Sequence, residues 1–581
     1  MENQEIARRL RQTADLMEVA GEDGFRVRSY RKAADTVEAW PQPLAGLCHD
    51  PKLLQALPGI GRTMSEHIRE LVATGELRLL QELLQRFQPG MLELLQVSGL
   101  GPKTIALIWE TYHAASLDEV EALARAGKLR LLPRLGAKAE EKILKAIAVR
   151  RELGGRFRRD QAEEALDRLL PALASAPGVL ELAVAGSYRR GKDTVGDLDL
   201  LLCGQDFPAA GQAAVERILH APGLDQVLAQ GENKISLRLH GGLQVDFRLL
   251  PPESLGAALQ YFTGSQQHNI SLRARAQQAG LKLNEYGLFR EGDGERVAGA
   301  TEAEIYTALG LAWIPPELRE ASGEIEAAAA GALPRLIEAA DLRGDLHMHT
   351  VATDGRATIE EMAEAAAARG YQYIAITDHS QALAMANGLD ERRMLEHLAR
   401  IRAAERAFQL HHPGFRILAG VEVDILADGR LDLADEVLAQ LDVVIGSIHS
   451  RFDQPQEETT ARLLRAVANP HLDILGHPSG RLLLRREPYR FDFERVLEAC
   501  LAHGVALEIN ASPERLDIND TQARRCRQLG LPVVVNTDAH HPRHLANIRY
   551  GLATARRGWL EAGDVLNTLP VEALLARLQR R

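Results

Sequence analysis

The chain has 581 residues, of which 46% are hydrophobic and 26% charged, so two to four globular domains can each bury a core. Its net charge of −11 excludes a uniformly basic nucleic-acid-binding surface. Four widely separated cysteines without a C-x-x-C pair argue against a disulfide framework or a zinc ribbon and favour the reducing cytoplasm. We expect no signal peptide at the polar N-terminus, and no apolar run reaches the roughly 18–20 residues of a membrane helix.

The predicted elements change type along the chain. Residues 1–155 have the periodicity of short amphipathic helices separated by glycine-containing turns. Strand-like runs, among them DLDLLLC and LQVDFRLL, occupy residues 178–250 around a helix predicted near 208–220, and residues 251–320 return to helix and turn. A helix and connector over 324–341 precede alternating strands and helices, the pattern of a parallel sheet or barrel.

Three turns in the first region share one shape: LPGIGRTMSEHI (57–68), VSGLGPKTIALI (97–108) and LPRLGAKAEEKI (132–143). In the first two, a hydrophobic-Gly-hydrophobic-Gly turn leads at once into a helix, whereas Arg134 replaces the first glycine of the third. Glycine permits a tight turn with positive φ, and the amides that begin the next helix can bind a phosphate oxygen. The turns resemble the helix-hairpin-helix motif, which binds DNA backbone without reading sequence; an ordinary helix connector is the alternative. The candidate DNA-binding glycines are Gly59, Gly61, Gly99 and Gly101.

The stretch GSYRRGKDTVGDLDLLL (186–202) contains two aspartates, Asp197 and Asp199, that a strand would point to one face. Asp246, in the later run LQVDFRLL, can lie beside them. Neighbouring carboxylates repel one another unless a cation lies between them, and three of them suit the two Mg²⁺ ions of nucleotidyl transfer. The glycine, serine and second arginine of GSYRR would then receive a phosphate. The alternative is a D-x-D pair on an exposed strand edge that has no catalytic role.

Together, GSYRRGKDTVGDLD, VDFRLLP, LQYFTGSQQHNISLRARA (259–276) and KLNEYGLF (282–289) resemble the family X DNA polymerases, the group of DNA polymerase beta, over residues 1 to about 320. Nucleotidyltransferases that modify tRNA or antibiotics share the first signature, but not YFTGS with the asparagine and arginine that follow it. The resemblance implies gapped or primer-template DNA and dNTPs as partners, Mg²⁺ or Mn²⁺ at the polymerase site, and a monomer.

The resemblance also implies roles for individual residues. The metal ligands would be Asp197, Asp199 and Asp246, with Arg248 controlling the position of Asp199. The triphosphate would contact Gly186, Ser187, Arg190 and Gly196. Tyr261, Phe262 and Gly264 would line the sugar and base and help to exclude a ribose 2′-OH. Asn269 would contact the incoming base edge, and Arg273 the template minor groove.

One position departs from the family pattern. Members that remove a 5′-deoxyribose phosphate use a lysine on the helix after the first hairpin as a Schiff-base nucleophile. The matching position here is His67, with Thr63 one turn earlier. Because imidazole is a poor substitute for that amine, we predict weak or absent lyase activity by this route.

Seven apolar strands follow residue 340, and nearly every one ends in residues that can bind metals; most of the 19 histidines lie there. The strand ends are DLHMH (345–349), YIAITDH (373–379), ILAGVEVD (417–424), VVIGSIH (443–449), DILGHP (473–478), VALEIN (505–510) and PVVVNTDAH (532–540). In a β/α barrel the C-terminal ends of the strands converge on the active face. One such histidine is more often a core residue than a ligand, but repetition over six strands argues for a metal site.

The nine candidate ligands are His347, His349, Asp354, His379, Glu422, His449, His477, Asp538 and His540. His347 and His349 would share one strand face. Mixed imidazole and carboxylate ligands suit Zn²⁺, Mn²⁺ or Fe²⁺ better than Mg²⁺, and nine ligands suit two or three ions.

This ligand pattern resembles the PHP (polymerase and histidinol phosphatase) domain, which performs metal-assisted phosphoester hydrolysis. The resemblance implies three metals. The first would be held by His347, His349, Glu422 and Asp538; the second by the bridging Glu422 with His449 and His477; the third by Asp354, His379 and His540. All nine positions hold residues that can bind a metal, so we expect an active domain.

We therefore expect a multidomain chain with all-α helix-hairpin-helix N-terminal domains, an α+β nucleotidyltransferase palm with a helical/β thumb, and a C-terminal distorted (β/α)7 barrel. The expected domains are an N-terminal helical domain with the first hairpin motif (1–85), a helical DNA-binding domain with the second (86–155), the palm (156–250), a nucleotide- and template-binding thumb (251–320), a linker (321–340) and a PHP metallohydrolase (341–581).

The expected function is gap filling in DNA repair by a nucleoid-associated, cytoplasmic DNA polymerase that also carries a metal-dependent 3′-5′ exonuclease or phosphoesterase. Two alternatives stay open at this stage. The barrel could be a small-molecule phosphatase fused to a nucleotidyltransferase. The chain could also be a scaffold that binds DNA ends and whose metals are structural.

Overall fold

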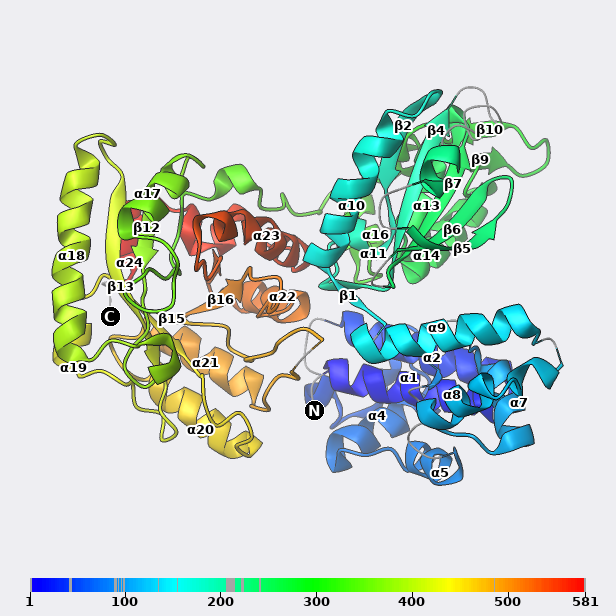
Figure 1. Ribbon diagram of the computed structural model, residues 1–581, viewed down its shortest axis with the longest axis horizontal. Coiled ribbons are helices and arrows are strands. Elements are labelled where there is room, and N and C mark those ends of the chain that lie inside the picture. Colours follow the sequence, from blue (N-terminus) through cyan, green and yellow to red (C-terminus); the bar gives the residue numbers. More distant parts are fainter. Residues whose placement is uncertain are drawn as a thin grey trace.

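The computed structural model describes residues 3–40, 44–87, 91, 94, 95, 97, 100–133, 135–153, 155–204, 215–220, 224–239, 242–484 and 486–578. Figure 1 shows three bodies: a bundle of helices, coloured blue to cyan, a sheet with flanking helices in cyan and green, and a barrel in green to red. None of the helices in the described ranges combines the length and apolarity needed to cross a bilayer.

The N-terminal body is all helical, as predicted. Its helices are α1 (Asn3–Val19), α2 (Gly24–Ala39), α3 (Pro51–Gln55), α4 (Arg62–Thr74), α5 (Arg78–Phe87), α7 (Pro102–Tyr112), α8 (Leu117–Arg125) and α9 (Ala137–Leu153). Helix α1 packs against α2, α5 and α7, and one apolar core extends from Ile6 to Ile147. Glycine turns without a side-chain cap precede α4 and α7, so the sequence pattern located both helix starts.

The middle body is built on a five-stranded sheet in the order β2-β4-β7-β6-β5. Its strands are β2 (Val179–Val184), β4 (Asp197–Gly204), β5 (Leu224–Gln230), β6 (Lys234–Leu239) and β7 (Gln244–Leu250); β1 (Phe157–Arg158) pairs with β3 (Thr194–Val195) separately. Helices α10 (Arg159–Ala174) and α11 (Gly186–Arg189) flank the sheet. Central strands β4 and β7 are parallel, and the other pairs of this sheet are antiparallel.

Two predictions for this sheet need comment. Strand β5 was not predicted, because it is an edge strand whose residues are mostly exposed and lack a buried alternation. The helix predicted near 208–220 is helical over residues 215–219, and residues 205–214 lie outside the described residues.

The segment after the sheet combines helices with a small antiparallel sheet. Its elements are α13 (Leu255–Thr263), α14 (Gln266–Gln278), β8 (Leu281–Asn284), β9 (Gly287–Arg290), β10 (Arg296–Ala298) and α15 (Glu302–Ala308). The pattern of helix and turn predicted for 251–320 misses this sheet, whose first turn depends on Asn284 accepting hydrogen bonds from the backbone amides of Tyr286 and Gly287. The helix predicted from residue 324 is short, α16 (Glu324–Ala329), because Gly331 and Pro334 end it.

The C-terminal body is a barrel of seven parallel strands that neighbour one another in chain order. They are β11 (Gly344–Asp345), β12 (Tyr373–Ile376), β13 (Arg416–Asp424), β14 (Val443–Ser447), β15 (Ile474–Leu475), β16 (Ala506–Asn510) and β17 (Val533–Asn536). A parallel bridge between Met348 and Ala539 brings the first strand to the last. The predicted distorted (β/α)7 barrel is therefore confirmed.

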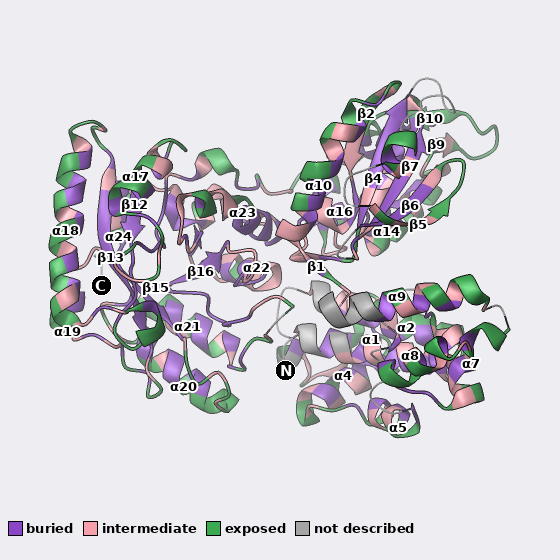
Figure 2. Cartoon of the chain, in the orientation of Figure 1, coloured by how far each residue is buried: buried purple, intermediate pink, exposed green. Residues whose placement is uncertain are grey.

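Helices surround the barrel and alternate with its strands. They are α17 (Ile359–Ala367), α18 (Glu391–Gln409), α19 (Asp435–Leu438), α20 (Gln456–Val467), α21 (Phe493–His503), α22 (Asp520–Leu529), α23 (Ile548–Arg557) and α24 (Val571–Leu578). The strands are almost entirely buried, while α18 buries one side and exposes the other (Figure 2). Helices α22 and α23 are on the side of the barrel that faces the middle body (Figure 1).

Two candidate metal centres

All nine predicted barrel ligands lie in one cluster at the C-terminal ends of the strands. His347 and His349 are not on β11 itself, since that strand ends at Asp345 and the chain leaves the sheet to reach the bridge at Met348. The prediction that the two histidines lie on one face of a strand is therefore wrong, because neither belongs to a strand. Both imidazole rings still approach Glu422.

Glu422, on β13, is the centre of the cluster. Five histidine nitrogens surround its two oxygens. Oε2 is 2.9 Å from His379 Nδ1, 3.4 Å from His347 Nε2 and 3.5 Å from His349 Nε2. Oε1 is 2.9 Å from His477 Nε2 and 3.4 Å from His449 Nε2. Burial would raise the pKa of Glu422, but His347, His449 and His379 hold it well below its usual range, so the group is a carboxylate.

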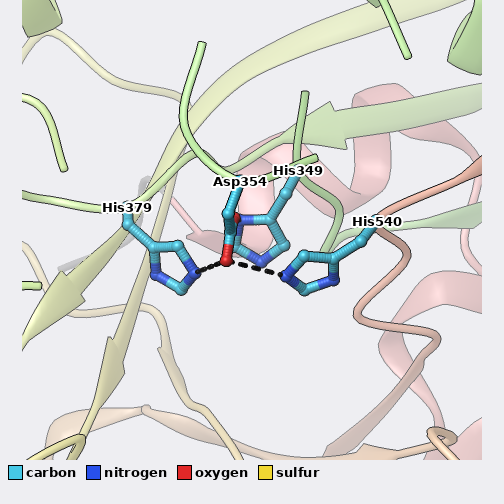
Figure 3. Close-up of side chains that lie close together, drawn as sticks. All are labelled: His349, Asp354, His379 and His540. Carbon is cyan, nitrogen blue, oxygen red and sulfur yellow. Dashed lines mark ion pairs between the residues drawn. The ribbon is translucent and has the colours of Figure 1, made fainter. Parts of the chain in front are cut away.

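Two further carboxylates complete the cluster. Asp538 Oδ1 lies 3.1 Å from His349 Nε2 and 3.6 Å from His347 Nε2. Asp354 Oδ2 lies between two rings, 3.6 Å from His379 Nε2 and 3.4 Å from His540 Nε2, and Figure 3 shows His349 behind it. The structure thus brings Asp354, His379 and His540 together, with His349 as a fourth member.

The spacing of these atoms fits metal ions. Two nitrogen or oxygen ligands about 2.1 Å from one tetrahedral ion lie about 3.4 Å apart, and most of the separations above are close to that. The buried atoms His347 Nε2, His349 Nδ1 and Glu422 Oε2 accept or donate no hydrogen bond within the described part of the chain. Burial, together with His379 and His540, lowers the pKa of His349 to about 4, so its imidazole is neutral and can bind a cation.

Sequence reasoning missed the carboxylates that orient the histidines. Glu508 Oε1 is 2.7 Å from His347 Nδ1, which directs the Nε2 lone pair of that ring toward Glu422. Asp424 Oδ1 is 3.2 Å from His449 Nδ1 in the same way. The available signal was an acidic residue inside a buried apolar strand, VALEIN or GVEVD, where an unpaired charge is costly.

The second centre lies on the five-stranded sheet. Asp199 of β4 is paired directly with Asp246 of β7, and Asp197, two residues earlier, lies on the same face of β4. Burial and the charges of Asp197 and Asp246 raise the pKa of Asp199 to about 7. Such mutual repulsion is what a divalent cation would relieve. The parallel pairing of β4 and β7 therefore brings together the three aspartates that the sequence singled out.

The three aspartates are more widely spread than the barrel ligands. Among the described residues, sets of three or more ligand atoms within 4.8 Å of one another occur at the barrel but not here. Asp246 instead accepts hydrogen bonds from Gln244 Nε2 at 3.0 Å, and its Oδ2 lies 2.8 Å from Lys234 Nζ. The lysine was not singled out from the sequence, because it lies on a separate strand with no motif around it.

Gly186 is fitted closely to this site. Its φ is +67°, and a Cβ atom there would lie 2.4 Å from Asp199 Oδ2. Ser187, Arg190, Gly196 and Asp197 line an adjoining cavity of about 760 Å³. The predicted triphosphate residues are therefore close to the carboxylates, around a space that a nucleotide could enter.

The predicted base and sugar residues lie on α13 and α14. The rings of Tyr261 and Phe262 meet edge-to-face at 5.1 Å, and the Arg248 guanidinium lies 4.7 Å from the centre of the Phe262 ring. The Asn269 amide donates to Tyr261 O at 2.6 Å and accepts from Gln260 Nε2 at 2.7 Å. Two hydrogen bonds within the protein therefore fix the position of the Asn269 side chain.

The remaining predicted nucleotide- and template-binding residues, Arg273 and Gly264, contact neighbouring residues of the protein. Arg273 Nε donates to Asn269 O at 3.3 Å, and a Cβ on Gly264 would lie 3.3 Å from Arg190 Nη1. Beside them, Arg189 pairs with the buried Glu302 at 2.8 Å, and Arg319 pairs with the same carboxylate at 2.6 Å. Sequence reasoning missed this interior ion triad, since its members are far apart along the chain.

The glycines of the N-terminal turns differ in the space around them. Gly59 has a φ of +78°, and a Cβ there would lie 2.7 Å from Lys32 Cγ. Gly61 and Gly101 precede α4 and α7 with open space around them, whereas Gly99 lies outside the described residues. His67 on α4 is 2.7 Å from the Tyr30 hydroxyl through Nδ1. Burial lowers the pKa of His67, so the ring is neutral and held by a hydrogen bond.

Comparisons with known proteins agree with this architecture. Family models match the helix-hairpin-helix domain (residues 1–77), the SAM-like helix-hairpin-helix tandem (91–148), the DNA polymerase beta palm (152–235), the DNA polymerase beta thumb (258–320) and the PHP domain (345–512). Over 582 residues, covering the whole of both chains, the sequence is 37% identical to the DNA polymerase/3′-5′ exonuclease PolX of Bacillus subtilis. The chain belongs to the bacterial family X DNA polymerases with a C-terminal PHP domain.

Relatives of each half support this assignment. Rat DNA polymerase lambda is 28% identical over 345 residues, which span 55% of this chain and 56% of the relative. A protein of Caldanaerobacter subterraneus described as a probable phosphatase is 34% identical over 208 residues, 34% of this chain and 75% of the relative. The family X resemblance and the PHP resemblance predicted from the sequence are both confirmed.

Proposed function

We propose that the protein is a DNA-directed DNA polymerase that fills short gaps during repair and also removes nucleotides in the 3′-5′ direction. The observation that carries this proposal is the presence of two separate ligand clusters in one chain. One is a set of three strand aspartates beside a nucleotide-sized cavity. The other is a buried cluster of histidines and carboxylates. The chain is similar over its whole length to a protein named for both activities.

At the polymerase centre we assign Asp197, Asp199 and Asp246 to two divalent cations, Mg²⁺ or Mn²⁺, which would lower the pKa of the primer 3′-hydroxyl and neutralise the triphosphate. Asp199 and Asp246, paired across β4 and β7, supply carboxylates on a rigid support. Ser187 and Arg190 would bind phosphate oxygens, and the backbone at Gly186 can approach because no Cβ intervenes. Tyr261 and Phe262 would line the sugar and base.

At the barrel centre we assign the nine histidines and carboxylates to two or three Zn²⁺, Mn²⁺ or Fe²⁺ ions, which would activate water and polarise a phosphodiester. Glu422 is suited to bridge, because both of its oxygens face histidine nitrogens. Glu508 holds His347 in one tautomer, and Asp424 does the same for His449. These contacts keep the ring nitrogens pointed into the cluster.

The partners and organisation follow from this assignment. We propose gapped or primer-template DNA and dNTPs as ligands, bound in part through the backbone amides beside Gly59, Gly61, Gly99 and Gly101, with Arg273 in the template minor groove and Asn269 at the base. We also propose a monomer that acts at the nucleoid, with the domain boundaries predicted from the sequence.

One gel assay tests the two-centre proposal. A labelled primer on gapped DNA is incubated with dNTPs and either Mg²⁺ or Mn²⁺, using the wild type, Asp199→Ala and His349→Ala. We expect Asp199→Ala to lose extension and keep degradation, and His349→Ala to do the reverse. If either change abolishes both activities while circular dichroism stays unchanged, the proposal of two independent centres is wrong.

A second candidate concerns the barrel alone. Its similarity to proteins described as probable phosphatases favours a phosphomonoesterase. A small phosphate ester and a short 3′-hydroxyl oligonucleotide, tested as competitors, separate the two possibilities. Hydrolysis of the ester that the oligonucleotide does not inhibit would favour the phosphatase, and mutual inhibition would favour the exonuclease.

A further inference from the structure

Helix α23 of the barrel lies directly against the triphosphate loop, residues 190–193, which begins with the predicted triphosphate residue Arg190. A Cβ on Gly191 of this loop would be 3.3 Å from Ala553 Cβ and 3.4 Å from Arg557 Cδ, both on α23. The loop follows α11 and precedes the β4 aspartates. One element of the hydrolase barrel is thus packed on the nucleotide-binding segment of the polymerase.

Arg557 joins α23 to this loop and to the carboxylate beside it by hydrogen bonds. Its side chain is 2% exposed. Nη1 donates to the backbone oxygen of Arg190 at 2.8 Å and to Glu320 Oε1 at 2.9 Å. Nη2 donates to Asp520 Oδ2 at 2.5 Å. The guanidinium therefore lies between a carboxylate of the polymerase half and one of the barrel, and supports the backbone of a triphosphate residue.

Glu320 connects Arg557 to the cations that would bind phosphate. Its Oε1 also accepts a hydrogen bond from Arg190 Nε at 2.9 Å, and its Oε2 lies 3.5 Å from Lys192 Nζ. Burial would raise the pKa of Glu320, but Lys192, Arg190 and Arg557 hold it well below its usual range. An anion is thus fixed beside Arg190 and Lys192, two cations of the triphosphate loop itself.

The same cavity of about 760 Å³ is lined from both halves of the molecule. Ser187 of α11 and Arg190 and Lys192 of the following loop come from the polymerase half, and Asp520, Arg524 and Arg557 come from the barrel. A nucleotide that enters it would meet barrel residues as well as palm residues. The barrel is therefore a wall of this site.

A triphosphate carries about four negative charges and is repelled by uncompensated carboxylates nearby. Without Arg557, Asp520 would lose its guanidinium partner and Glu320 would keep only Arg190 and Lys192, so Glu320 would compete more strongly with phosphate for these two cations. We infer that Arg557 of the barrel is a positioning residue for the polymerase reaction: it shares the negative charge of Glu320 and so weakens the hold of that carboxylate on Arg190 and Lys192, which a dNTP can then engage. This inference rests on the proposed polymerase function.

The test is steady-state single-nucleotide gap filling by the full-length protein, with the exonuclease rate measured on the same preparations. We expect Arg557→Met to raise the KM for dNTP about tenfold and to change kcat less than about twofold, because a partnered charge near the phosphates is lost. Arg557→Lys should retain part of the affinity, since the charge remains but the paired geometry does not. Glu320→Gln added to Arg557→Met should restore most of it.

Arg549→Met is the matched control. Arg549 is on the same helix and pairs with Glu163 of α10 across the same interface at 3.0 Å, away from the triphosphate loop. An unchanged KM for Arg557→Met, an equal rise for Arg549→Met, or no rescue by Glu320→Gln would overturn the inference. A parallel loss of exonuclease activity would also overturn it, because it would indicate general loosening of the barrel. A wild type that does not extend primers would instead refute the proposed function itself.

Discussion

Lys234 Nζ lies 2.8 Å from Asp246 Oδ2, so an ammonium group is bound to one of the three carboxylates assigned to the polymerase metals. Lys234 is on β6, beside β7, and its charge lowers the pKa of Asp246 against the effect of burial. A divalent cation at this centre must share Asp246 with the lysine.

We therefore expect Lys234→Met to lower the Mg²⁺ concentration that gives half-maximal extension. Loss of one competing positive charge at this distance should lower the half-maximal Mg²⁺ concentration about tenfold. The measurement is a Mg²⁺ titration of gap filling at fixed ionic strength. Lys282→Met, at an exposed position on β8, is the control. A higher Mg²⁺ requirement in Lys234→Met would contradict competition.

Gly186→Ala should abolish most extension. The new Cβ would lie 2.4 Å from Asp199 Oδ2, so the carboxylate or the loop must move, and a displacement of about 1 Å costs on the order of 100-fold in rate. Gly280→Ala is a matched control, because Gly280 also has a positive φ, +70°, but open space around its Cβ. Single-turnover extension distinguishes them; equal losses in both variants would implicate backbone strain alone.

Glu508→Gln should weaken metal binding at the barrel without removing any assigned ligand. The carboxylate that holds His347 Nδ1 would be lost, and such supporting contacts are worth about 10- to 100-fold in affinity. Metal titration of the exonuclease, alongside metal content by mass spectrometry, would measure the effect. Extension by the same variant should be unchanged. Metal affinity within twofold of wild type would exclude an orienting role for Glu508.

The free energy of unfolding at acidic pH should depend on the ionisation of Glu302. Burial raises its pKa, but hydrogen bonds and charges from Arg189 and Arg319 outweigh this and lower it to about 2, from 4.5. A lowered pKa stabilises the fold at pH values above 4.5 by about 3 kcal/mol, and this contribution is lost as pH falls toward 2. Glu302→Gln should therefore lower the unfolding midpoint in urea at pH 7 much more than at pH 3. The exposed Glu291→Gln is the control; equal losses at both pH values would refute the linkage.

Borohydride should trap little covalent adduct on an abasic gap. His67 is a neutral ring bonded to Tyr30 where a lyase would carry a free amine. His67→Ala should therefore leave the trapped amount unchanged. A wild-type adduct that disappears in His67→Ala would contradict this expectation.

The sequence predicted those parts of the centres that follow from local chemistry. Asp197 and Asp199 are two residues apart on a strand, and six apolar runs end in assigned ligands, so the sheet aspartates and the barrel cluster could be predicted from the sequence. Lys234, Glu508 and the Arg189–Glu302–Arg319 triad could not, because each depends on which strands become neighbours. Strand β5 was missed for a related reason: an exposed edge strand has no buried face to produce alternation.

The order of the barrel strands has a consequence for synthesis. The first and last strands meet at the ligand cluster, and His349 and Asp538, 3.1 Å apart, are separated by 189 residues of chain. Domains of a nascent chain fold from the N-terminus as they leave the ribosome. A growing molecule therefore gains its complete set of polymerase carboxylates first. The hydrolytic centre can assemble only after Asp538 and His540 have been made, so shorter nascent chains lack the complete set of hydrolytic ligands.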